Sequence, residues 1–197
     1  MNKEYIQTGR TNQKLETRDK ILKSAHYFLK KGKSFNLENV AQKSGVSRAT
    51  IYRYYSNVEI LTTEASLDIN TLDSEAILEN YQDKSLEEKV LGIQDYFNRL
   101  SLDNEPLFRR YLSAVIVPST SKSVRGARRI KALHLALEKE NLPLQEKKDL
   151  ANLLTLFMGI EPLIVTKDVA GLNNNESQRM LKRGMQLILK GYLSENK

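Results

Sequence analysis

The residue types with the clearest chemical pattern lie between Asn36 and Leu61, where two short amphipathic segments flank Ser44-Gly45-Val46-Ser47. Glycine accepts the positive φ of a tight turn and serine is a preferred helix N-cap, so this spacing predicts two short helices joined by a tight turn. Val46 is expected to fill the angle between the two helices. A helix-turn-helix of this kind can place its second helix in the major groove of duplex DNA. The chemistry indicated is therefore recognition of bases and phosphates.

The second of these helices has one side suited to a protein core and another suited to DNA. Its side chains are spaced by about 100°, so Ile51 and Tyr55 fall together and are expected to face the core. On the other side, arginine can bond guanine or phosphate, threonine a thymine methyl or phosphate, and tyrosine a phosphate. For Tyr52 and Tyr54, packing against the core is the alternative. The expected DNA contacts of the motif are Asn36, Lys43, Ser47, Arg48, Ala49, Thr50, Tyr52, Arg53 and Tyr54.

The net charge is concentrated in the same part of the chain. The 197 residues include 31 Lys and Arg and 24 Asp and Glu, a formal charge of +7. Residues 1–61 hold 12 basic and 5 acidic side chains, whereas residues 62–197 hold 19 of each. The first segment therefore carries the whole excess. A basic module on a neutral body favours a polyanion as the partner of that module.

Composition argues against several other classes of function. The chain has no cysteine, which excludes disulfides, a thiolate nucleophile and cysteine-based metal sites. His26 and His134 are too far apart for a local metal-ligand spacing. There is no Ser/His/Asp arrangement, phosphate-cradling glycine loop or carboxylate–histidine cluster, so we expect no enzymatic activity, no cofactor and no metal. The apolar stretch from Leu153 to Val165 is shorter than the roughly 20 residues of a membrane span, and no signal peptide is evident. A cytoplasmic protein without a membrane partner is expected.

Apolar residues recur at intervals of three and four along most of the chain, which predicts an all-α fold of about nine helices. We expect a flexible basic arm over residues 1–16, a helix-turn-helix domain over 17–61 and a helical ligand-sensing and dimerisation domain over 62–197. Thr17 is the expected cap of the first helix, and Ser56 with Glu59 the expected capping box of the fourth. The expected helices cover about 17–31, 36–44, 47–55, 56–72, 85–100, 106–115, 124–140, 145–167 and 177–193.

Residues 45–52, Gly-Val-Ser-Arg-Ala-Thr-Ile-Tyr, and the aromatic-Ser-Asn-x-Glu-x-Leu pattern of residues 55–61 resemble the DNA-binding head of the TetR family of bacterial regulators. The resemblance covers residues 17–61 and extends to the remainder only in length and number of helices. It implies a homodimer that binds an inverted-repeat operator, most often as a repressor. It also implies that a small-molecule effector enters the C-terminal domain and releases the operator.

One position departs from the family pattern. Members of the family usually carry a lysine one residue before the glutamate of the fourth helix, where it holds a phosphate, but here that position is Val58. Lys43, the backbone amides at the start of that helix, or cations of the arm are the expected replacements. The arm cations are Arg10, Lys14 and Arg18, which could enter the minor groove. A disordered, solubilising leader is the alternative for this segment.

The apolar character of residues 145–167 favours dimerisation. Because this segment is apolar almost all round, it must be buried on two sides, and a second copy of the chain can cover one of them. By resemblance, the last two helices of each copy form a four-helix interface. The expected interface residues are Leu153, Leu156, Ile160, Leu181, Gly184, Met185, Ile188 and Tyr192.

A second group of residues in the C-terminal segment could bind the effector. For Glu161 the alternatives are an ion pair with Arg128 or Arg129, or exposure at a kink caused by Pro162. For His134 and the aromatic residues the alternative is ordinary packing. The candidate ligand contacts are Phe97, Phe108, Tyr111, His134, Phe157 and Glu161.

The sequence leaves three classes of function to compare. A ligand-responsive DNA-binding regulator accounts for the motif and the charge distribution. A helical adaptor or antagonist that keeps the head without specific DNA binding is supported only by Val58. An all-α enzyme has no catalytic constellation in its favour.

Overall fold

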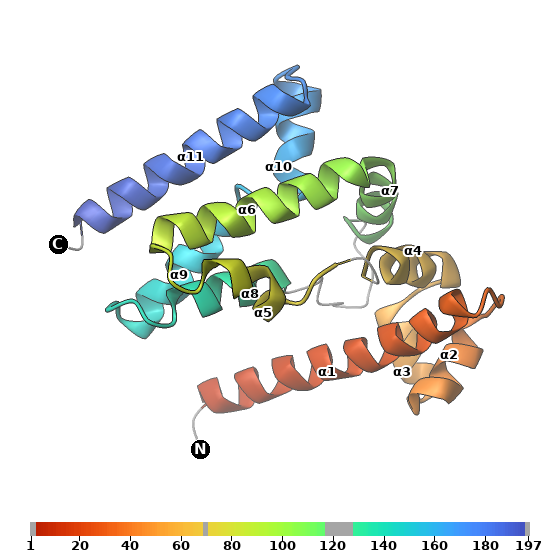
Figure 1. The fold of residues 1–197 in the computed structure, drawn as a ribbon. Coiled ribbons are helices and arrows are strands. Elements are labelled where there is room, and N and C mark those ends of the chain that lie inside the picture. Colours follow the sequence, from red (N-terminus) through yellow and green to blue (C-terminus); the bar gives the residue numbers. More distant parts are fainter. Residues whose placement is uncertain (1–2, 69–70, 117–127, 196–197) are drawn as a thin grey trace. The chain divides into compact units, whose positions relative to one another are not determined.

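The computed structural model describes residues 3–68, 71–116 and 128–195 (Figure 1). All regular secondary structure in these ranges is helical, which confirms the all-α prediction. Parts of the expected helices around Ile69 and from 117 to 127 lie outside the described residues.

The chain divides into two compact units. One comprises Met1–Thr71 with Pro106–Arg125, and the other comprises Leu72–Glu105 with Gly126–Lys197. The first unit thus includes more of the chain than the helix-turn-helix domain expected over residues 17–61. Its helices are α1 (Lys3–Lys30), α2 (Leu37–Ser44), α3 (Arg48–Tyr54), α4 (Val58–Asp68) and most of α7 (Glu105–Ile116).

The core of the first unit is formed by the helices of the motif and α1. Helix α1 packs on α2 and α4, and α2 packs on α3. Buried residues Ile21, Leu22 and Ala25 recur at the spacing of one helix face, which explains why α1 presents a single apolar stripe to this core. The other buried members of the cluster are Leu37, Val40, Ala41, Ile51, Tyr55, Leu61 and Ala65.

The turn between α2 and α3 has the predicted capping chemistry. Asn36 accepts a hydrogen bond from the Asn39 amide at 2.8 Å, and the Asn39 side chain accepts one from the Asn36 amide at 3.1 Å. Gly45 has φ 70°, and its N–H donates to the carbonyls that end α2. Ser47 Oγ then accepts from the Thr50 amide at 3.0 Å and begins α3. The predicted helix-turn-helix is confirmed as local structure.

Two predicted helix starts in this unit are wrong. Helix α1 begins at Lys3, so residues 3–16 are helical instead of forming a flexible arm, and Thr17 Oγ1 donates back to the Gln13 carbonyl within the helix. Residues 3–16 contain no proline, so nothing in this segment prevents the backbone ladder from continuing towards the N-terminus. The cap of α4 is Asn57, whose Oδ1 accepts from the Ile60 amide at 2.9 Å, instead of Ser56.

The second unit is organised around one long helix. Helix α6 packs against α5, α8, α10 and α11, and α8 also packs on α9. The predicted capping box of Ser85 and Glu88 is present at the start of α6. Helix α5, capped by Asp73, was not predicted. The helices of this unit are α5 (Ser74–Leu78), α6 (Leu86–Asp103), α8 (Arg128–Leu137), α9 (Leu144–Thr155), α10 (Ile160–Ile164) and α11 (Asn174–Glu195), with a 3₁₀ turn at Glu79–Tyr81 and a π-helical turn at Val165–Val169.

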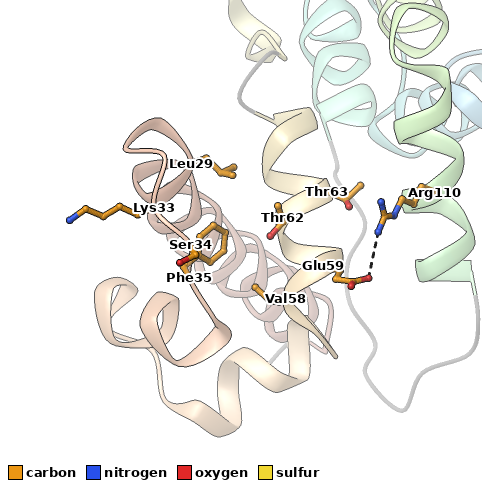
Figure 2. Close-up of a pocket in the computed structure, with 9 residues that line it drawn as sticks. All are labelled: Leu29, Lys33, Ser34, Phe35, Val58, Glu59, Thr62, Thr63 and Arg110. Atoms are coloured by element: carbon orange, nitrogen blue, oxygen red, sulfur yellow. Dashed lines mark ion pairs between the residues drawn. The ribbon is translucent and has the colours of Figure 1, made fainter.

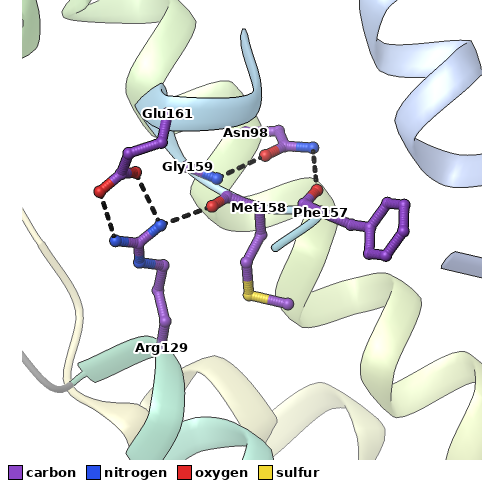
Figure 3. A network of polar contacts seen from close by, with 6 residues as sticks. All are labelled: Asn98, Arg129, Phe157, Met158, Gly159 and Glu161. Atoms are coloured by element: carbon purple, nitrogen blue, oxygen red, sulfur yellow. Dashed lines mark hydrogen bonds and ion pairs between the residues drawn. The ribbon is translucent and has the colours of Figure 1, made fainter. Parts of the chain in front are cut away.

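The single helix predicted over residues 145–167 is wrong, because the chain breaks between α9 and α10 (Figure 3). Gly159 has φ 91°, and its N–H donates to Asn98 Oδ1 at 2.8 Å. The Gln94 amide donates to the Phe157 carbonyl at 3.0 Å, and Arg129 donates to the Met158 carbonyl. Side chains of α6 and α8 therefore replace the helical hydrogen bonds that the break removes.

Pro162 does not cause this break. It lies in the first turn of α10, where proline is tolerated because no helical acceptor is required for its missing N–H. By length and composition the segment Leu144–Val169 could cross a membrane, a test that core helices of soluble proteins also pass. In the structure this segment is interrupted by the break at Gly159.

Candidate nucleic-acid interface

Helix α3 presents the two faces that its sequence predicts. Ile51 is fully buried and Tyr55 is 2% exposed, so both face the core of the first unit. Burial raises the pKa of the Tyr55 hydroxyl, which stays protonated inside this core. The opposite side of the helix is open to solvent, and Tyr52 is 46% exposed. The exposed candidates on and beside α3 are Asn36, Lys43, Ser47, Arg48, Ala49, Tyr52 and Arg53, while Thr50 is half-buried.

Tyr54 differs from its neighbour Tyr52. It is half-buried and packs against the core of the first unit. Its hydroxyl donates to the Lys14 carbonyl of α1 at 3.3 Å. The packing alternative therefore describes Tyr54, whose hydroxyl ties α3 to the N-terminal part of α1.

Glu38, in the first turn of α2, contacts exposed side chains of α3, although no sequence pattern indicates a role for it. Tyr52 Oη donates to Glu38 Oε1 at 2.7 Å, and Arg48 Nη2 donates to the same oxygen at 3.3 Å. The hydrogen bond from Tyr52 and then one from the Glu38 backbone N–H, with a smaller contribution from Arg48, lower the pKa of Glu38. The bond between the two side chains raises the pKa of Tyr52. No local spacing signals this contact, because α2 and α3 must pack before the three side chains meet.

An open groove of about 460 Å³ runs between α1 and α3. Lys14 and Thr17 line it from α1, and Arg53 and Thr50 line it from α3. Of the arm cations, Lys14 is thus beside α3. Arg18 instead forms an ion pair with Glu64 of α4 in which both side chains are mostly buried, and the side chain of Arg10 lies outside the described residues.

Lys43 is held by an aromatic side chain of α1. Its Nζ lies 3.6 Å from the centre of the exposed Tyr27 ring, and the Lys31 amine lies 5.9 Å from the same ring. A cation over a tyrosine ring at an exposed site contributes about 0.5–1 kcal/mol. This contact fixes the lysine near the end of α2 without removing its charge.

Val58, at the start of α4, is half-buried against the core of the first unit, beside both apolar and polar residues (Figure 2). It borders an open pocket of about 370 Å³ whose apolar lining includes Leu29 and Phe35. Arg110 of α7 reaches this pocket and lies 3.6 Å from Glu59, while the Lys33 amine points away from the other lining residues. Because position 58 is a valine, its side chain cannot make the phosphate contact that the resemblance implies for a lysine there.

The four candidate ligand contacts of the second unit lie in different local environments. Phe97 is buried in the core, and Phe157 is packed so closely on α11 that a Cβ at Gly184 would lie 2.7 Å from its ring. Glu161 forms two hydrogen bonds with Arg129, at 2.9 and 3.0 Å, which is one of its predicted alternatives. His134 is exposed on α8, and desolvation together with Lys148 lowers its pKa.

The remaining ligand candidates belong to the other unit. Phe108 and Tyr111 are half-buried on α7, within the unit that contains the helix-turn-helix. Tyr111 borders a small pocket with Tyr54 and Tyr55. The six candidates are thus divided between the two units, and a common ligand site for them stays a prediction.

The predicted dimer residues fall into two groups. Ile160, Leu181 and Met185 are at most 6% exposed, so the prediction that they form an interface is wrong: the inner faces of α10 and α11 are covered by the chain itself. Gly184, Ile188 and Tyr192 are half-buried. Leu153 and Leu156 are 36% and 66% exposed, and Met180 and Leu187 on α11 are also exposed. Five of the eight predicted interface residues are thus at least partly accessible to a second copy.

Within the part of the chain that the structure describes, no three His, Asp or Glu side chains are grouped so that they could hold a metal ion. The arrangement of α2 and α3 instead offers exposed cations, hydroxyls and one carboxylate on a rigid, capped pair of helices. Comparison with protein-family models, curated proteins and solved structures found no match to this chain.

Proposed function

We propose that this protein is a sequence-specific DNA-binding transcriptional regulator that acts as a homodimer, most simply as a repressor. The observation that carries the proposal is the surface of α3: Ile51 is buried while Tyr52 and Arg53 are exposed on a helix capped at both ends. An exposed, rigid helix following a tight turn is the element that helix-turn-helix proteins place in the major groove.

Charge supports the same proposal. The excess of seven positive charges lies within residues 1–61, and Arg48, Arg53, Lys43 and Lys14 are all exposed near α3. Cations that neutralise phosphates supply most of the sequence-independent affinity for DNA and make it dependent on salt. Arg48 and Arg53 can also bond guanine edges, which is the commonest specific contact in the major groove.

Dimerisation would give the protein two such helices for two half-sites. A single head offers few contacts, whereas two linked heads bind paired half-sites at an increased effective concentration. The exposed apolar side chains of Leu153, Leu156 and Leu187 support contact with a second copy. We further propose that a small-molecule effector acts on the second unit.

The test is selection of bound fragments from random duplex DNA, followed by titration of the selected sequence. We expect an inverted repeat. Arg53→Ala should weaken binding to it by about 5- to 150-fold, the equivalent of one lost base contact. Arg99→Ala is the matched control, because Arg99 is also exposed but pairs with Asp95 in the second unit. Equal affinities of the wild type and Arg53→Ala would refute the assignment of α3 as the reading helix.

Lys14 tests the contribution of the groove between α1 and α3. Lys14→Ala should weaken binding to all duplexes by a similar factor, because a phosphate contact carries no sequence information. The slope of log affinity against log salt should become shallower by about 1. If the salt dependence of Lys14→Ala equals that of the wild type, Lys14 does not contact a DNA phosphate.

A helical adaptor that does not bind DNA is the second candidate, and the valine at position 58, in place of the usual lysine, favours it. Without a cation at the start of α4, the head has one phosphate contact fewer than the family it resembles. A flat titration with genomic fragments at low salt, where non-specific binding is strongest, would select this alternative.

A further inference from the structure

An acidic side chain lies on the surface proposed to meet DNA. Glu38 is in the first turn of α2, and its side chain is 36% exposed. Arg48 lies beside it, and Lys43 and Arg53 are further exposed cations on α2 and α3. A carboxylate at this position repels phosphates, so its charge reduces the general electrostatic affinity of the head for any duplex.

The same carboxylate organises two side chains of α3. Arg48 and Tyr52 are four residues apart and therefore neighbours on one face of the helix. Both donate to Glu38 Oε1, Tyr52 at 2.7 Å and Arg48 at 3.3 Å. One acceptor on α2 thus limits the positions that the guanidinium and the phenol can take before any DNA arrives.

The position of Glu38 is itself fixed by local structure. The reciprocal hydrogen bonds of Asn36 and Asn39 set the start of α2 on either side of it. The free N–H groups of a helix N-terminus favour a carboxylate at this point. Gly45 and Ser47 then fix where α3 begins relative to α2. The arrangement of the three side chains is therefore built into the turn and does not depend on the N-terminal part of α1.

We infer that Glu38 is a specificity-determining residue: its carboxylate positions Arg48 and Tyr52 as one unit for a particular base sequence, and its charge weakens binding to all other sequences. The inference rests on the proposed function. It accounts for an acidic side chain on the surface of a basic head. A carboxylate bonded to Arg48 and Tyr52 lowers non-specific affinity more than specific affinity, because only the matching sequence uses the arrangement that it holds.

The experiment compares Glu38→Gln with the wild type on the selected operator and on random-sequence duplex of the same length. Glutamine has the same size but removes the charge, and its neutral carbonyl is a weaker acceptor than the carboxylate for Arg48 and Tyr52, so the positioning is loosened as well. We expect tighter binding to random duplex and no gain on the operator, so that the ratio of the two affinities falls by about 5- to 150-fold, the range of one base contact. Asp19→Asn, which removes one negative charge from the exposed side of α1, is the control and should leave the ratio unchanged.

A measurement on the free protein tests the contact without DNA. Carbon-13 NMR of labelled tyrosine, with the Tyr52 signal assigned through Tyr52→Phe, follows ionisation of the phenol. Because the hydrogen bond to Glu38 raises the pKa of Tyr52, the Tyr52 signal should titrate at a lower pH in Glu38→Ala, which removes the acceptor, than in the wild type. A titration that Glu38→Ala leaves unmoved would show that the contact is absent in solution and would overturn the inference.

The outcomes separate the two proposals. If the wild type binds no duplex at any salt concentration, the proposed function fails and the role of Glu38 fails with it. If the wild type selects an operator and Glu38→Gln keeps the same ratio of affinities, only the role of Glu38 is refuted.

Discussion

Replacement of Asn98 by alanine should release one backbone amide at the break between α9 and α10. Asn98 is 3% exposed, and its Oδ1 is the acceptor for the Gly159 N–H at 2.8 Å. A buried donor left without an acceptor costs about 1–3 kcal/mol. The Phe157 carbonyl, which Asn98 also contacts at 3.4 Å, keeps its shorter bond from Gln94 at 3.0 Å. The expected loss is therefore concentrated on the Gly159 amide.

Amide hydrogen exchange measures this loss at the residue concerned. Because exchange of a protected amide follows local opening, 1–3 kcal/mol corresponds to about 5- to 150-fold faster exchange at Gly159. Gln94→Ala is the matched control: it removes the donor to the Phe157 and Leu181 carbonyls but leaves the Gly159 amide bonded. Exchange at Gly159 that is equally fast in the wild type and Asn98→Ala would refute the view that α6 stabilises the break.

Three further predictions concern the helix-turn-helix. Gly45→Ala should destabilise the first unit by about 1–2 kcal/mol in urea unfolding, because Gly45 has a φ of 70°, which alanine adopts only with strain. The added Cβ has space, since nothing lies within 4 Å of it. Gly191→Ala, at a helical site with the same space, is the control and should be neutral or stabilising. Ile51→Ala should cost about 2–5 kcal/mol in the same assay, because Ile51 is fully buried, and a smaller effect would contradict the assigned core face. The pKa of Glu38 is below its ordinary 4.5, so the contacts of its carboxylate are present at neutral pH and are lost as the pH falls through that lowered value. In an NMR titration over this range, the ring resonances of Tyr52 should change. Those of Tyr27, which does not contact Glu38, should not.

The turn between α2 and α3 shows what local sequence can establish. Asn36, Gly45 and Ser47 act through hydrogen bonds and a backbone angle within a few residues, so their roles follow from residue type and spacing. The inward position of Ile51 and Tyr55 follows in the same way from helical periodicity. The concentration of positive charge in residues 1–61 needs no structure at all.

The helix starts that were wrong show where local rules compete. Ser56 and Asn57 are both good caps, and Asn57 is the one whose side chain accepts the hydrogen bond that starts α4. Thr17 is an acceptable cap, but the backbone ladder of α1 continues past it. Residue type alone ranks such neighbouring caps poorly, because their preferences as caps are similar.

Periodicity, capping and composition are enough to predict the all-α class, the helix-turn-helix and the basic character of its unit. The break of residues 145–167 at Gly159 depends on packing, since Asn98, Gln94 and Arg129, which replace the lost helical bonds, come from α6 and α8. The contact of Glu38 with Arg48 and Tyr52 depends on packing in the same way. Hydrogen bonds between residues distant in sequence have no periodicity, so they become visible only once the helices that carry them have packed.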